Sequence, residues 1–159
     1  MEAAWFAAKG HRVRAVEPVK ALRLQGEQLH RSKRIEWLDD RLPELEVATI
    51  ASHAVRSGSP VGGVAAPAQK PSRRSLSNIA RMLKPGALVI MSLRTGPGAL
   101  NRPTFPVPAE RTFALAAALG WRVIRQARAD SLQQRNRDAG VTWEWLVFRF
   151  APDLWNGGD

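Results

Sequence analysis

Two hydrophobic periods alternate along the first part of the chain and predict helices and strands in turn. The pattern predicts a helix, a strand, an amphipathic helix and a second strand, in that order, over residues 1–8, 11–16, 19–29 and 35–38. Gly10 ends the first helix and Pro18 ends the first strand, as these residue types commonly do. The second helix brings Leu22 and Leu29 to helical spacing. Strands that alternate with helices are typical of an α/β fold.

The middle of the chain lacks such a period. Residues 47–51 predict a weak strand, whereas residues 52–74, rich in Gly, Pro, Ala and Ser, predict a flexible loop. Helical spacing returns after this loop, and the helix ends at Lys84-Pro85-Gly86. The apolar face of this helix consists of Leu76, Ile79, Ala80 and Leu83.

The rest of the chain continues the alternation. The continuous apolar run Ala87–Leu93 predicts a strand covered on both faces in a mostly parallel part of the sheet. Further along we predict a helix, a strand, a non-helical polar loop and a last strand, over residues 108–119, 121–128, 130–140 and 141–150. Because this loop is too short in regular structure for a covered crossover, the last strand should run antiparallel to its neighbour. We therefore predict a single α/β domain over residues 1–150, with a sheet of mixed direction and a tail at 151–159.

Charge adds a second line of inference. The 159 residues carry a formal net charge of +10, and no Asp or Glu occurs from Val47 to Ala109. A basic excess of this kind is typical either of a nucleic-acid-binding module or of a solvated basic surface. Cysteine is absent, which excludes disulfides and thiolate metal sites. The three histidines lie far apart, so no metal site is expected.

Membrane and secretion signals are not found in the sequence. No apolar run approaches the roughly 18 residues that a membrane helix needs. The N-terminus lacks the charged-then-apolar pattern of a secretory signal. We therefore expect a cytoplasmic protein that does not enter a membrane.

Acidic residues follow both predicted strands of the first part. Glu17 follows the strand at 11–16, and Asp39 and Asp40 follow the strand at 35–38. An acid at the tip of such a strand is typical of the second half of a nucleotide-binding βαβ unit, where it accepts hydrogen bonds from ribose hydroxyls. Strand-end acids are also common as solvated turn residues, and this alternative stays open.

These segments together resemble a class I S-adenosylmethionine-dependent methyltransferase. The resemblance rests on the segments HRVRAVEP, RIEWLDDRLPEL, LKPGALVIMSL and VTWEWLVFRF, and it covers two blocks, Ala3–Glu46 and Ser75–Phe150. It implies a Rossmann-like mixed sheet with an antiparallel C-terminal strand. It also implies S-adenosylmethionine as cofactor and a small molecule as methyl acceptor.

The resemblance also implies roles for particular residues. Glu17 matches the acid that binds the ribose hydroxyls of the cofactor. Asp39 matches the acid that receives the adenine amino group, with Asp40 as the alternative. Pro18 and Leu38 would line the adenine edge. Methyl transfer from a sulfonium needs alignment more than acid–base chemistry, so the resemblance points to no catalytic residue.

The chain departs from this family in two places. The family's first strand and Gly-rich loop have no counterpart before the first helix, and residues 52–74 match nothing in the family. Our hypothesis is an N-terminally shortened copy whose middle segment is read in a shifted frame. The alternatives to a methyltransferase impaired by truncation are a non-catalytic remnant of the fold and the basic nucleic-acid-binding module. Strand edges left unpaired by a missing central strand would favour oligomers.

Overall fold

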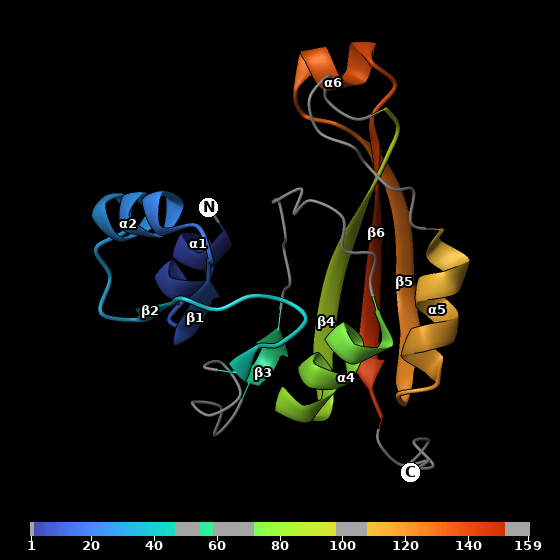
Figure 1. Ribbon diagram of the computed structural model, residues 1–159, viewed down its shortest axis with the longest axis horizontal. Coiled ribbons are helices and arrows are strands. Elements are labelled where there is room, and N and C mark those ends of the chain that lie inside the picture. Colours follow the sequence, from blue (N-terminus) through green and yellow to red (C-terminus); the bar gives the residue numbers. More distant parts are fainter. Residues whose placement is uncertain (1, 47–54, 59–71, 98–107, 152–159) are drawn as a thin grey trace. The chain divides into compact units, whose positions relative to one another are not determined.

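The computed structural model describes residues 2–46, 55–58, 72–97 and 108–151 (Figure 1). The chain divides into two compact units, Met1–His53 and Ala54–Asp159, and each is described by itself. The single domain expected over residues 1–150 stays a prediction. The predicted strand at 47–51 and most of the predicted loop and tail lie outside the described residues.

The first unit is a helix–strand–helix–strand arrangement around a parallel pair of strands. Its elements are α1, β1, α2 and β2, at Glu2–Ala8, Val13–Val16, Lys20–Leu29 and Ile35–Leu38. β1 and β2 pair in parallel, from Val13 opposite Ile35 to Val16 opposite Leu38. The order of elements agrees with the sequence prediction, and the bounds of β2 agree to the residue.

Helix α2 approaches β2 through a glycine. A Cβ atom built on Gly26 would overlap the Trp37 ring, so the indole fills the space a side chain would need. The apolar side chains of α2 contribute little to this contact, because Leu22, Leu24 and Leu29 are all exposed. The helix and its amphipathic pattern are as predicted, but no residue of α2 is buried.

Replacing Gly26 by alanine should therefore destabilise the first unit. We expect a loss of about 1–3 kcal/mol in the free energy of unfolding, as for overpacked sites, offset in part by the better helix propensity of alanine. Urea denaturation followed by circular dichroism measures this loss. Trp37→Leu removes the ring, so adding Gly26→Ala to that variant should cost less unfolding free energy than adding it to the unaltered protein. An equal penalty in both backgrounds would contradict the contact.

The second unit contains a four-stranded mixed sheet. Its described elements are β3, α4, β4, α5, β5, α6 and β6, at Val55–Gly58, Arg73–Met82, Leu83–Thr95, Ala109–Ala117, Trp121–Asp130, Gln134–Asp138 and Thr142–Phe150. The strand order is β3-β4-β6-β5. β3 is parallel to β4, whereas β6 runs antiparallel to both β4 and β5. The antiparallel C-terminal strand is thus confirmed.

The core of the second unit lies on one face of this sheet. Val89 of β4 faces Phe148 of β6 across the strand pair, and Leu146 follows on the same face of β6. Phe148 is 0% exposed and makes edge-to-face contacts with Phe113 of α5 and Trp121 of β5, at ring-centroid distances of 6.1 and 5.8 Å. Helices α4 and α5 also contact each other (Figure 1).

The opposite face of β4 is only half-buried. This face carries Leu88, Ile90, Ser92 and Arg94 of β4 beside Trp143, Trp145 and Val147 of β6. Coverage of the apolar run on both faces stays a prediction, whereas the mostly parallel surroundings predicted for it are wrong. The strand also has one parallel and one antiparallel neighbour.

The predicted loop at 52–74 is wrong at both of its described parts. Residues 55–58 form β3, which is stabilised by pairing with the distant strand β4. Helix α4 begins at Arg73, because the Ser72 side chain accepts the backbone N–H of Ser75 at 3.1 Å and caps the helix.

The polar loop predicted between the last two strands contains a short helix, α6. Arg137 donates to the backbone oxygens of Ser131 and Leu132 at 2.8 and 2.7 Å, so side-chain contacts hold this turn rather than an apolar face. Among the described residues, no helix combines the length and apolar character that crossing a membrane requires.

Candidate functional site

The strands β1 and β2 end at the same edge of their pair, because they are parallel. Glu17 directly follows β1, and Asp39 directly follows β2. The backbone N–H of Glu17 donates to the oxygen of Leu38 at 3.0 Å, which extends the ladder one step past the strands. The carboxyl ends of parallel strands are where α/β folds bind ligands. The structure thus brings two of the predicted site residues to one edge.

Glu17 uses one of its two carboxylate oxygens within the chain. Its Oε1 atom accepts the backbone N–H of Val19 at 2.8 Å, at the residue that precedes α2. Within the described ranges, no hydrogen-bond partner reaches the other oxygen, Oε2. The side chain is half-buried. One oxygen is therefore left to accept a hydrogen bond from a ligand, and Oε1 keeps further acceptor capacity.

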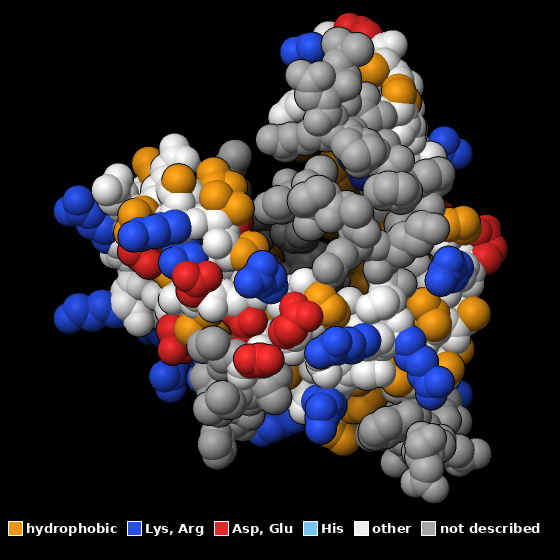
Figure 2. Space-filling model, viewed as in Figure 1, with side chains coloured by type: hydrophobic (Ala, Val, Ile, Leu, Met, Phe, Trp, Pro, Cys, Tyr) orange, Lys and Arg blue, Asp and Glu red, His pale blue; other side chains and the backbone are white. Residues whose placement is uncertain are grey.

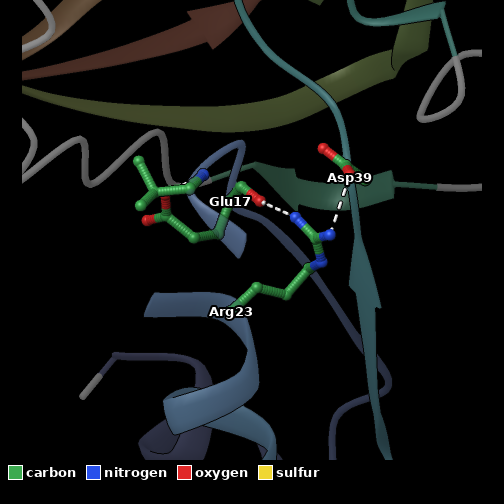
Figure 3. Close-up of polar contacts among 4 residues, drawn as sticks. Glu17, Arg23 and Asp39 are labelled. Atoms are coloured by element: carbon green, nitrogen blue, oxygen red, sulfur yellow. Dashed lines mark hydrogen bonds and ion pairs between the residues drawn. The ribbon is translucent and has the colours of Figure 1, made fainter. Parts of the chain in front are cut away.

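A residue that the sequence analysis did not select joins the two strand ends. Arg23 lies one turn into α2, where its backbone N–H donates to the oxygen of Val19. Its Nη1 atom donates to the backbone oxygen of Glu17 at 2.7 Å, and its Nη2 atom donates to Oδ2 of Asp39, also at 2.7 Å (Figure 3). The Arg23 side chain is only 14% exposed, whereas the Asp39 side chain is 68% exposed. The guanidinium thus anchors an otherwise solvent-facing carboxylate.

The remaining predicted site residues differ in their access to solvent. Pro18 is exposed beside Glu17, whereas Leu38 is buried at the end of β2. Asp40 is also buried, and its Oδ1 atom accepts the backbone N–H of Arg41 at 2.8 Å. Of the two successive acids, Asp39 is therefore the one that presents its carboxylate to solvent. The roles of these residues toward a cofactor stay predictions.

The two units differ in charge. On the face drawn in Figure 2, acidic side chains gather over the first unit, whereas the second unit shows mainly basic and apolar side chains. The first unit is close to neutral, so the formal excess of +10 comes almost wholly from the second unit. The net basic excess that suggests a polyanion partner is therefore separate in sequence from the acid-tipped strands.

Comparison with solved structures identifies the fold. Sequence comparison gives no match to a protein-family model or to a curated protein. The 1,6-didemethyltoxoflavin-N1-methyltransferase of Burkholderia thailandensis, with bound 1,6-didemethyltoxoflavin and S-adenosylhomocysteine, is similar with a TM-score of 0.67 and 17% identity over 93% of this chain and 65% of that chain. The N-methyltransferase NodS of Bradyrhizobium japonicum gives a TM-score of 0.61 and 12% identity, over 94% of this chain and 81% of that one.

The chain therefore has the Rossmann-like α/β fold of class I S-adenosylmethionine-dependent methyltransferases. It spans 65% of the length of the Burkholderia enzyme. The [4+2]-cyclase SpnF is also similar, with a TM-score of 0.60 and 12% identity over 93% of this chain and 71% of that chain. The same fold thus occurs in a protein named for a different reaction, and function has to be argued from the site.

Proposed function

We propose that this protein binds S-adenosylmethionine at the carboxyl ends of β1 and β2 and transfers its methyl group to a small-molecule acceptor. The observation that carries the proposal is the position of Glu17 and Asp39 at one sheet edge, where Arg23 links the backbone oxygen of Glu17 to the carboxylate of Asp39. Support also comes from the fold, which is that of enzymes described as acting on small molecules.

The residues at this edge fit the adenosine part of the cofactor. A ribose has two vicinal hydroxyl donors, and Glu17 keeps acceptor capacity on both carboxylate oxygens. An adenine has an amino donor at C6. Asp39 keeps Oδ1 as an acceptor, while its Oδ2 accepts the hydrogen bond from Arg23. Exposed Pro18 offers an apolar surface next to Glu17. Hydrogen-bond acceptors at this edge thus match hydrogen-bond donors on adenosine in number and kind.

The chain's own residues would bind and orient, rather than move protons. The cofactor, when bound, supplies an electrophilic methyl group already activated by the positive charge on sulfur. Glu17 and Asp39 would fix the adenosine end, so that the donor is held in one orientation.

Binding of the cofactor is the direct test. We expect isothermal titration of the full chain with S-adenosylmethionine, and separately with S-adenosylhomocysteine, to give dissociation constants tighter than about 1 mM, which corresponds to about −4 kcal/mol. Transfer is then tested by mass spectrometry of small-molecule mixtures incubated with the methyl-labelled donor. Dissociation constants weaker than this for both ligands would instead favour a fold that has lost its cofactor.

A further inference from the structure

Arg23 makes two contacts in two directions from one guanidinium group. One nitrogen contacts the backbone at the end of β1, and the other contacts the side chain at the end of β2, both at 2.7 Å. Because the guanidinium is planar and its donors are fixed in a fork, the position of one contact determines the position of the other. Arg23 therefore sets where the carboxylate of Asp39 lies relative to Glu17 (Figure 3).

This contact matters because Asp39 has little else to hold it. Its side chain is 68% exposed, and Arg23 is its ion-pair partner within the described part of the chain. An exposed aspartate without such a partner samples several side-chain rotamers, and a ligand has to offset that freedom on binding. With Oδ2 held by Arg23, Oδ1 stays as an acceptor in a fixed position.

We propose that Arg23 is a positioning residue that aims Asp39 at the purine C6 substituent and so makes the site prefer adenine to 6-oxopurines. The proposal rests on the adenosine-binding function proposed above and adds a determinant of its specificity. Arg23 acts through Asp39 and does not itself contact the base.

The chemistry of discrimination follows from the two substituents. A 6-amino group donates a hydrogen bond to a carboxylate, whereas a 6-oxo group is an acceptor and leaves that carboxylate facing another lone pair. A bound base would remove water from this exposed carboxylate, and a desolvated polar group left unpaired is penalised more than a missing contact is. The penalty requires that Asp39 cannot rotate away, and Arg23 supplies that restraint.

The test uses S-adenosylhomocysteine and S-inosylhomocysteine, titrated calorimetrically into the full chain. The inosyl ligand has an oxo group in place of the amino group at purine C6 and a proton on the adjacent N1. The unaltered protein should bind the adenosyl ligand about tenfold more tightly, the size expected for one charge-assisted hydrogen bond. Arg23→Met should reduce this preference to about twofold or less, mainly by weakening the adenosyl ligand. The preference of Arg23→Lys for the adenosyl ligand should lie between these tenfold and twofold values, since one ammonium cannot reproduce the two-directional fork.

A matched control is available in the same pair of strands. Arg14 of β1 forms an ion pair with Glu36 of β2, with its Nε atom 2.9 Å from Oε2, and it lies in the middle of the strands rather than at their carboxyl ends. Arg14→Met removes a β1–β2 ion pair without touching Asp39, so the tenfold preference should persist. A merely structural role for Arg23 would weaken both ligands by the same factor and leave their ratio unchanged.

The outcomes separate this proposal from the one on which it rests. If the unaltered protein binds neither ligand, the proposed cofactor function fails and the role of Arg23 fails with it. If it binds both ligands equally, or if Arg23→Met keeps the tenfold preference, the role of Arg23 is overturned while cofactor binding stands. Should Arg23→Met not fold, Arg23→Lys decides, and an unchanged preference in that variant overturns the proposal.

Discussion

Replacing Phe148 by alanine should lower the free energy of unfolding of the second unit by about 4 kcal/mol. Phe148 is fully buried, and it lies in β6, the strand that pairs with both β4 and β5. Its ring contacts Phe113 and Trp121, so truncation removes aromatic contacts on two elements and leaves a cavity between them. The cost should lie at the upper end for core truncations, because paired strands on both sides limit how far the cavity can collapse.

Guanidinium denaturation, followed by circular dichroism, measures this cost. Val147→Ala is the matched control, since Val147 is the neighbouring residue of β6 on the half-buried face. We expect a loss of about 1 kcal/mol there, in line with typical single substitutions. Equal losses in the two variants would mean that the face carrying Phe148 is not the core of the unit.

The sequence predicted the first unit well because its signals are local. The strand at Ile35–Leu38 is short, begins and ends with buried apolar residues and is bounded by polar residues, and its predicted bounds match β2. Gly10 has a φ of 90°, a conformation that glycine adopts readily, which is why it marks the end of α1. These features depend on residues within a few positions of one another.

The second unit shows what local patterns miss. The strand β3 has the sequence VRSG, which lacks a strand signal and pairs with β4 across a long sequence separation. Helix α6, with the sequence QRNRD, has no apolar period, and side-chain contacts from Arg137 to the backbone support it. In both cases tertiary or side-chain contacts decide the structure, and the helix or strand propensity of the residues does not decide it.

The candidate site was predicted in part for a related reason. Acids after two parallel strands reach one edge by backbone geometry alone, so Glu17 and Asp39 could be paired from the sequence. Arg23, the residue that bridges the strand ends, could not be predicted from the sequence, because Lys20 and Arg23 both lie in the first turn of α2 and are both basic. Only the side-chain contacts of the structure distinguish Arg23, whose fork contacts both strand ends.

Replacing Glu17 by alanine should weaken binding of S-adenosylhomocysteine about 100-fold. Two hydrogen bonds from ribose hydroxyls to one carboxylate would be lost, at about 1.5 kcal/mol or more each, and every 1.4 kcal/mol is a factor of ten in affinity. The same change removes the acceptor for the backbone N–H of Val19, so stability should also fall by about 1 kcal/mol, as for one lost hydrogen bond. Calorimetric titration and thermal denaturation measure the two effects separately.

Glu17→Gln separates ligand binding from the local structural role of Glu17. The amide keeps one oxygen for the N–H of Val19, so the melting temperature should stay close to that of the unaltered protein. It loses the charge and one acceptor, and affinity should still fall about tenfold. Glu36→Gln is the matched control, because Glu36 is an exposed acid of β2 whose partner is Arg14, away from the strand ends. Affinity that falls equally in Glu36→Gln, or that survives in Glu17→Ala, would exclude Glu17 as the ribose ligand, since a carboxylate that binds the diol cannot be replaced without loss.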